Sequence, residues 1–154
     1  MELSKIYIYR MIHIKNIMHI LKYGITHKNS PNSNPDYISI GDKSMIDTRV
    51  KKSVNISNGN RSGPQETIML GNFIPFYFGT RMPMLYVIQH GGNSVEKATP
   101  PQDIVYVVCK LSDIIGSGVT FYFSDGHALD HFSSFYNSSK VNELPNIVDS
   151  ETYY

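Results

Sequence analysis

The stretch YISIGDKSMIDTR, residues 37–49, decides the architecture that we expect. Its first four residues form an alternating pattern that favours a short β-strand, and Gly41-Asp42 is typical of a turn. We therefore expect a strand, a turn and a polar segment that ends in Arg49. Glycine allows a close approach to a ligand, and a fixed arginine suits a diphosphate. On composition alone, a hairpin with a solvated arginine is the commoner structure.

The composition indicates an ordinary globular protein and limits how it can bind nucleic acid. The 154 residues suit one domain, with 41% hydrophobic and 18% charged residues. The net charge is +1, from 14 basic and 13 acidic residues, which excludes binding by a broad basic face. Any contact with nucleic acid must be local. Lys51, Lys52 and Arg61 are candidates for such a patch, although a solvated loop is the simpler interpretation.

Cysteine content and the start of the chain bear on the cell compartment. Cys109 is the only cysteine and lies in an apolar run, so the sequence has no disulfide framework, and we expect a buried, inert thiol. Met1–Lys5 lacks a basic region followed by an apolar run, and no segment reaches ~18 apolar residues. These features predict a cytoplasmic protein.

Hydrophobic periodicity predicts an α+β fold in a single domain, residues 1–154, without internal repeats. We expect a helix over residues 16–23 that ends at Gly24, and a second short helix over residues 128–136. The expected strands are residues 6–14, 73–78, 84–88, 103–108 and 120–123. The expected loops are residues 29–35, 53–67 and 91–101.

Three groups of residues suggest chemistry, each with a simpler alternative. His13 ends the first strand and can hydrogen-bond a ribose hydroxyl or an amide, although a structural histidine is commoner. His127 and His131 lie four residues apart, but no third ligand has metal-site spacing, so we predict no metal. Ser124, Asp125 and His127 are hydrolase residue types, but the sequence lacks a nucleophile elbow.

Several blocks along the chain together resemble one family. They are YRMIHIKNI at 9–17, Gly24, PDYISIGDKSMIDTR at 35–49, IPFYF at 74–78, RMPMLY at 81–86, DIVY at 103–106 and FSDGHA at 123–128. In this order they resemble the DarT family of DNA ADP-ribosyltransferase toxins, over about residues 8–150. No single block would identify the family, whereas the collinear set is specific.

The resemblance implies both a fold and an activity. The family has an ADP-ribosyltransferase-like fold with a mixed or antiparallel split sheet, an N-terminal helix and long functional loops. Its members use NAD, without a metal, to modify thymidine in single-stranded DNA, or guanosine in one branch. They pair with an antitoxin of macrodomain type that removes the modification. NAD, single-stranded DNA and such an antitoxin are therefore the expected partners.

The resemblance also implies roles for individual residues. Arg49 matches the catalytic arginine and is expected to contact NAD. The other expected cofactor-binding residues are His13, Ile14, Lys15, Gly24 and Tyr37. His127 matches the histidine that opens the substrate-recognition loop, and Tyr77 and Met84 are the other candidates for DNA binding. Tyr77, Tyr86 and Tyr122 are candidates to stack on unpaired bases, with core packing as the alternative.

One element of the family pattern has no match. The family's catalytic glutamate follows the FSDGHA block in a segment with a Gln-x-Glu-like pattern, which does not occur before Tyr154. Glu151 lies in different surroundings, and we do not assign it this role. We therefore expect a C-terminally incomplete domain. The alternatives are a catalytically silent fragment that binds NAD or single strands, and a transferase directed at proteins.

Overall fold

The protein forms two β-sheets joined by short helices. The structure is a computed structural model that describes residues 2–80, 82–92 and 94–148. The strands are β1 (Tyr7–His13), β2 (Ser53–Ile56), β3 (Glu66–Met69), β4 (Ile104–Lys110), β5 (Tyr122–Ser124) and β6 (Phe135–Asn137). The α-helices are α1 (Ile17–Tyr23), α2 (Lys43–Lys51), α3 (Pro83–His90), α4 (Leu111–Gly116) and α5 (Leu144–Ile147). Short 3₁₀ helices are η1 (Leu3–Lys5), η2 (Ile14–Asn16), η3 (Leu70–Asn72), η4 (Pro101–Asp103) and η5 (Ser138–Glu143).

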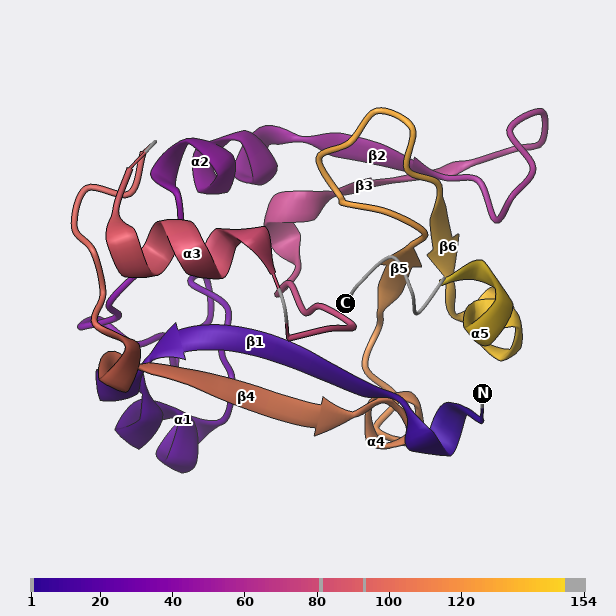
Figure 1. Cartoon of the computed structure of the whole chain (residues 1–154). Helices are drawn as coiled ribbons and strands as arrows, with labels where there is room; N and C mark the ends of the chain where they lie inside the picture. The colour runs from indigo at the N-terminus through magenta and orange to yellow at the C-terminus, as the bar shows by residue number, and fades with distance from the viewer. Residues whose placement is uncertain (1, 81, 93, 149–154) are drawn as a thin grey trace.

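The two sheets differ in length and topology. Strands β1 and β4 form an antiparallel ribbon in which Tyr7 pairs with Lys110 and His13 with Ile104. The second sheet has the order β3-β2-β6-β5 and is mixed, because β2 and β6 are parallel and the other pairs antiparallel. In Figure 1 the ribbon lies below α3, and the second sheet lies to its upper right. The prediction of an α+β fold with a split sheet is confirmed.

Two groups of buried side chains hold these elements together. One joins Ile6, before β1, to Leu111, Phe123, Tyr136, Leu144 and Val148, and so connects the N-terminal segment with α4, β5, β6 and the α5 region. The other joins Val54 and Ile56 on β2 to Leu70 and Phe135. Burial of these side chains provides the main driving force for folding, at roughly 25 cal/mol per Å² of apolar surface.

The strongest local patterns led to correct predictions. The predicted strands at residues 6–14 and 103–108 are β1 and β4, and the early helix is α1. Gly24 ends α1 with φ 76°, and its N–H donates to the carbonyl oxygen of Ile20. The strand predicted at residues 120–123 is β5, shifted by one to two residues.

The interpretation of residues 37–49 was wrong in its secondary structure. Residues 37–40 form no strand, and Gly41-Asp42 is no hairpin turn. Instead Asp42 caps α2, since its side chain accepts a hydrogen bond from the Met45 N–H. Arg49 therefore lies in the last turn of a helix. Neither the predicted polar segment nor the hairpin alternative describes this stretch.

Two apolar runs were also misassigned. The strand predicted at residues 84–88 is part of α3, which has Pro83 in its first turn and ends at Gly91 with φ 75°. A short apolar run alone does not distinguish a strand from a helix, and here proline at the helix start decides. The strand predicted at residues 73–78 is reduced to one bridge, in which Tyr77 and Tyr9 exchange two backbone hydrogen bonds.

Two polar segments hold strands that the sequence did not reveal. The loop predicted at residues 53–67 contains β2 and the start of β3, because Val54 and Ile56 are buried while Ser53 and Asn55 face solvent. The helix predicted at residues 128–136 is a series of turns followed by β6. Asp125 and Asp130 accept backbone N–H groups there, which competes with helix formation.

Cys109 is half-buried rather than buried. Burial, followed by the negative charge of Asp113, raises the pKa of its thiol, so the group stays protonated, as expected for an inert cysteine. None of the helices in the described residues has the length and apolar character that a membrane crossing requires.

Candidate functional site

Helix α2 places Arg49 against the segment that follows η3. The N-terminus of α2 is fixed by Asp42, whose carboxylate also accepts from the Ser44 hydroxyl and the Ser94 N–H. At the other end, the Arg49 Nη2 donates to the carbonyl oxygen of Phe73 at 2.5 Å. The side chain is thus half-buried and held in one direction.

Gly71 allows α2 to lie this close to η3. A Cβ at this position would lie 2.5 Å from the Val50 carbonyl oxygen and 2.8 Å from the Val50 Cα, so any side chain would force the backbones apart. Val50 follows Arg49 directly, and Gly71 precedes Phe73 by two residues. The close backbone packing therefore sets the distance over which Arg49 reaches the Phe73 carbonyl.

A second arginine reaches the same segment from β1. The Arg10 Nη1 donates to the Pro75 carbonyl oxygen at 3.0 Å, and Nη2 donates to the Tyr37 hydroxyl at 3.4 Å. Sequence reasoning did not select Arg10. The sequence nevertheless contained a signal for it. Arg10 alternates along β1 with the same period as the buried Ile8 and Ile12, so it lies on the same face of the strand. A charged residue on a face that otherwise points to the core indicates a specific role.

The electrostatics of this pair favour an anion. Burial, followed by the positive charge of Arg10, lowers the pKa of Arg49. Within the described residues, neither arginine forms an ion pair with a carboxylate. Both guanidinium groups are positively charged and bond only to neutral groups among the described residues. A bound anion such as a diphosphate would therefore stabilise the pair.

His13 presents one ring nitrogen at the end of β1. Its Nδ1 accepts a hydrogen bond from the Lys15 N–H at 3.1 Å, so a neutral ring carries its proton on Nε2. A carboxylate oxygen of Asp103 lies 3.9 Å from Nε2, too far for a hydrogen bond. The side chain is 12% exposed. The Nε2–H group is therefore oriented and, among the described residues, available to donate to a ligand oxygen.

Asn16 ties the predicted cofactor loop to the helix that follows β1. Its side chain, 1% exposed, donates to the Ile38 carbonyl oxygen at 2.8 Å and accepts from the Ile38 N–H at 2.9 Å. This pair of hydrogen bonds to one residue fixes Tyr37 beside Arg10. The local sequence indicates this role only weakly, because asparagine beside a helix start is commonly a cap.

The other predicted cofactor residues lie around this group. Ile14 and Lys15 form the exposed start of η2, directly after His13. Tyr37 is partly exposed, with its hydroxyl on Arg10. Gly24 lies at the end of α1, where no atom would meet a Cβ within 4 Å, so its positive φ explains the glycine.

The residues predicted to bind DNA come from three elements. Tyr77 is partly exposed and pairs with the Tyr9 backbone. Met84 lies half-buried in the first turn of α3. His127 is exposed on the loop between β5 and β6, and its carbonyl oxygen accepts from the Ser133 hydroxyl.

Two of the aromatic candidates for base stacking are already engaged. The Tyr122 hydroxyl donates to Glu66 at 2.5 Å, a bond that raises the pKa of Tyr122, and its ring meets Phe73 edge-on. Tyr86 stacks on His90 at 4.2 Å between ring centroids. Tyr122 therefore serves packing in this structure, whereas Tyr86 remains largely exposed.

In the parts of the chain that the structure describes, no group of three or more His, Cys, Asp or Glu side chains gathers as metal ligands would. His127 and His131 do not combine with an acid into such a group there. Glu151 and Arg81 lie outside the described residues.

The structure is an α+β domain in which Arg10 and Arg49 reach the same segment, Phe73–Pro75, and present guanidinium groups suited to an anion. The family described as "ssDNA thymidine ADP-ribosyltransferase, DarT" matches residues 9–152. The chain belongs to this family.

Similar proteins include relatives from two bacteria. A DNA ADP-ribosyl transferase of Escherichia coli O127:H6 is 32% identical over 144 residues, covering 94% of this chain and 61% of the relative. A DNA ADP-ribosyl transferase of Thermus sp. (strain 2.9) is 29% identical over 131 residues, covering 84% of this chain and 56% of the relative. The chain thus spans less than two thirds of the length of these relatives.

Solved structures agree in fold. The structure of Thermus sp. 2.9 DarT in complex with ADP-ribosylated ssDNA has a TM-score of 0.73 and 27% identity, covering 94% of this chain and 63% of that one. The structure of the same protein in complex with NAD+ has a TM-score of 0.67, covering 98% and 64%. The expected ADP-ribosyltransferase-like fold is confirmed.

Proposed function

We propose that this domain uses NAD to ADP-ribosylate a base, thymidine by preference, in single-stranded DNA. The observation that carries the proposal is the half-buried Arg49, which matches the family's catalytic arginine by resemblance and has no carboxylate partner among the described residues. The family match and the likeness to a DarT structure in complex with NAD+ support this assignment.

The cofactor would lie across the group formed by β1, the 37–40 segment and α2. Arg49 and Arg10 would hold the diphosphate, since both present guanidinium donors next to the Phe73–Pro75 segment. His13 would donate from Nε2 to a ribose hydroxyl or to the nicotinamide amide. Ile14, Lys15, Gly24 and Tyr37 would form the surrounding wall.

The reaction moves the ADP-ribosyl group from nicotinamide to the base, so that one bond at the ribose C1 is replaced by another. The bond between the ribose C1 and the nicotinamide nitrogen breaks, and nicotinamide leaves as a neutral ring with the electron pair. The ring nitrogen of the thymine forms the new bond to C1. Its proton passes to a general base. Arg49 would hold the diphosphate in place as the ribose cation forms, and would help to activate the base nitrogen.

The DNA would approach from the side of the β5–β6 loop. His127, Tyr77 and Met84 are the residues that we assign to the target strand. Aromatic stacking allows single strands to bind without a large net charge, which agrees with a chain whose net charge is +1.

The biological context that we propose rests on the family resemblance. The protein would be the toxin of a toxin–antitoxin pair, would act in the cytoplasm, and would be opposed by a macrodomain-type hydrolase that removes ADP-ribose from DNA. Co-expression with such a hydrolase should relieve growth inhibition, and no change in growth would contradict this pairing.

A second candidate is a domain that binds NAD or single strands without transfer. The observation that favours it is that no Gln-x-Glu-like segment, which the resemblance implies for the catalytic glutamate, follows the FSDGHA block in residues 129–154. Loss of a group that stabilises the ribose cation lowers the rate by about 10²–10³-fold, yet leaves binding contacts in place.

The test is a transfer assay with NAD labelled in the adenylate moiety. The chain is incubated with oligothymidylate, with an oligonucleotide that contains guanosine but no thymidine, and with mixed proteins. Label on the thymidine oligonucleotide, with equimolar nicotinamide release, supports the proposal. Binding of NAD and DNA without label supports the silent domain, and label on protein alone would contradict both.

A further inference from the structure

A polar cavity lies between the β2–β3 hairpin and the β5–β6 loop, apart from the arginine pair. Its volume is about 370 Å³. The hairpin side contributes Asn55, Ser57, Arg61 and Gln65, and the loop side contributes His131, Ser133 and Ser134. Among the described residues, neither an acidic nor an apolar side chain lines it. Guanidinium, imidazole, amide and hydroxyl groups in one hollow are suited to the oxygens of a phosphate.

Two cations clamp the loop against the hairpin side. The Lys52 Nζ donates to the Ala128 carbonyl oxygen at 3.2 Å, and the Arg61 Nη2 donates to the Phe132 carbonyl oxygen at 3.5 Å. These are two of the three residues that the sequence offered as a basic patch. The Arg61 bond is long and uses one of five donors, so most of the exposed guanidinium can still bind an anion.

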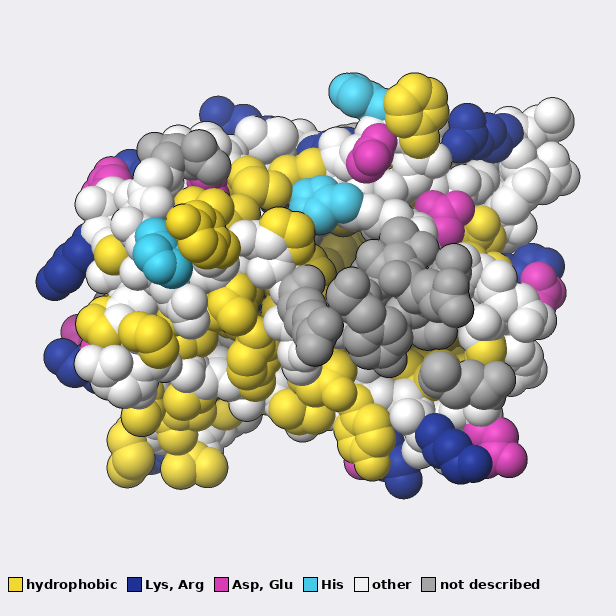
Figure 2. Space-filling view, in the orientation of Figure 1, with side chains coloured by type: hydrophobic (Ala, Val, Ile, Leu, Met, Phe, Trp, Pro, Cys, Tyr) yellow, Lys and Arg dark blue, Asp and Glu magenta, His cyan; other side chains and the backbone are white. Residues whose placement is uncertain are grey.

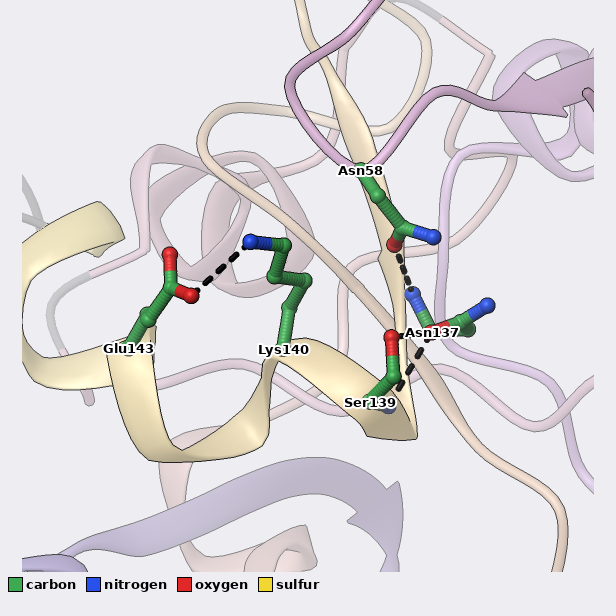
Figure 3. A network of polar contacts seen from close by, with 5 residues as sticks. All are labelled: Asn58, Asn137, Ser139, Lys140 and Glu143. Carbon is green, nitrogen blue, oxygen red and sulfur yellow. Dashed lines mark hydrogen bonds and ion pairs between the residues drawn. The ribbon is translucent and has the colours of Figure 1, made fainter. Parts of the chain in front are cut away.

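The start of the β2–β3 loop is fixed by a polar network (Figure 3). Asn58 adopts φ 51°, its N–H donates to the Phe135 carbonyl oxygen, and its Oδ1 accepts from the Asn137 N–H. The Asn137 side chain in turn accepts from the N–H and hydroxyl of Ser139. Because Ser57 precedes Asn58, this network holds one wall of the cavity in position.

An exposed aromatic ring lies next to the cavity. Phe132 is 86% exposed and directly follows His131. Figure 2 shows a histidine and a hydrophobic side chain projecting together above the β5–β6 loop, with an acidic side chain directly below them and Lys or Arg side chains to the right. A largely solvated phenylalanine ring gains by stacking on an unpaired base, at about 1–3 kcal/mol per base.

We propose that this cavity binds a backbone phosphate of single-stranded DNA outside the modified nucleotide, while Phe132 stacks on an adjacent base. This inference rests on the proposed function and adds a second contact to it. The loop joins both places, since the Ser133 hydroxyl at the cavity donates to the carbonyl of His127, the residue assigned to the target base. The cavity thus sets the path of the strand, and the arginine pair binds NAD.

The test measures binding of a fluorescent twelve-residue oligothymidylate by anisotropy at several salt concentrations. Arg61→Glu should weaken binding at least about tenfold, as loss of a charge-assisted hydrogen bond does. The slope of the logarithm of the binding constant against the logarithm of the salt concentration should also fall by about one, the value for one lost phosphate contact. Phe132→Ala should weaken binding without changing the salt dependence. NAD affinity should stay the same in both variants.

Lys97→Glu is the matched control, because this exposed cation lies in the loop after α3, at the opposite end of the molecule from the hairpin (Figure 1). If the chain binds the oligonucleotide and Arg61→Glu behaves like Lys97→Glu, the cavity is not a strand site, and the proposed function is unaffected. If the folded wild-type chain binds no oligonucleotide at all, both the cavity and the DNA part of the proposed function are overturned.

Discussion

The two sheets present their candidate functional residues in different ways. Strands β1 and β4 pair over seven positions, and Arg10 and His13 project from the β1 strand itself. In the four-stranded sheet, β2 and β6 are joined through a single residue pair, Ile56 and Phe135, and the functional candidates lie on loops. These loops are held by bonds from side chains to backbone groups, such as Lys52 to Ala128 and Arg61 to Phe132.

This difference suggests a division of labour. A long ribbon holds its side chains in well-defined positions. Such precision is needed to align a cofactor for bond cleavage. Loops on short strands adapt more easily to a flexible single strand. Substitutions on the ribbon and α2 should therefore impair NAD binding or transfer and spare DNA binding. Substitutions on the β5–β6 loop should impair DNA binding and spare NAD binding.

The largest effect is expected for Arg49→Ala. Transfer to an oligonucleotide should fall by at least about 10²-fold, because a group that stabilises the reacting centre is lost. DNA binding and the melting temperature should change little, since the side chain makes one hydrogen bond to Phe73. Lys43→Ala, which removes an exposed cation at the start of the same helix, is the control. Unchanged transfer in Arg49→Ala would end the assignment.

Asn16→Ala should reduce stability and NAD binding together. The substitution leaves the Ile38 N–H and carbonyl without their partners, at a cost of about 1–3 kcal/mol for each group that stays buried. Chemical denaturation and NAD titration measure the two effects. Asn142→Ala, at an exposed position in η5, should change neither. Lower stability with normal NAD affinity would show that the 37–40 segment is not part of the cofactor site.

Gly71→Ala tests whether close packing positions Arg49. The added methyl group would collide with Val50, and overpacking of this kind costs about 1–3 kcal/mol. Transfer should fall with stability while DNA binding persists. Gly116→Ala is the matched control, because an added methyl group there would meet no atom within 4 Å and alanine favours a helix. Equal effects of the two substitutions would argue against a special role for Gly71.

The smallest effect concerns pH. The Ser44 hydroxyl, followed by the backbone N–H groups of Met45 and Ser94, holds the pKa of Asp42 below its usual value, although burial opposes this shift. The charged carboxylate therefore stabilises the fold above the unfolded pKa of about 3.9, and this contribution is lost as the pH falls through the lower folded value. Thermal melts should show Asp42→Asn less stable than wild type at pH 7 and equal to it near pH 2. A constant difference would contradict the account.

The sequence predicted the ribbon better than the second sheet for a physical reason. Residues 6–14, 16–23 and 103–108 carry long apolar patterns that specify strand or helix locally. Strands β2, β3, β5 and β6 have three or four residues each, and β6 depends on pairing with distant partners. Helix α2 was missed because Asp42 was interpreted as a turn residue rather than as a cap.

The candidate site was predicted in part. The resemblance selected Arg49 and His13, whose roles stay predictions, and the structure shows that both are oriented by hydrogen bonds to the backbone. Arg10, Asn16 and Gly71 were not selected. Their importance depends on contacts with Pro75, Ile38 and Val50, between 21 and 65 residues away, which no local pattern encodes.

The most direct test of the division between the two sides is NAD binding by calorimetry to three chains. These are wild type, His13→Ala on the ribbon and His131→Ala on the β5–β6 loop, each first shown by a cooperative melt to be folded. We predict that wild type binds NAD, that His13→Ala weakens binding by up to about tenfold through loss of one hydrogen bond, and that His131→Ala binds normally. Failure of folded wild type to bind NAD, or equal weakening in both variants, would contradict a cofactor site on the ribbon.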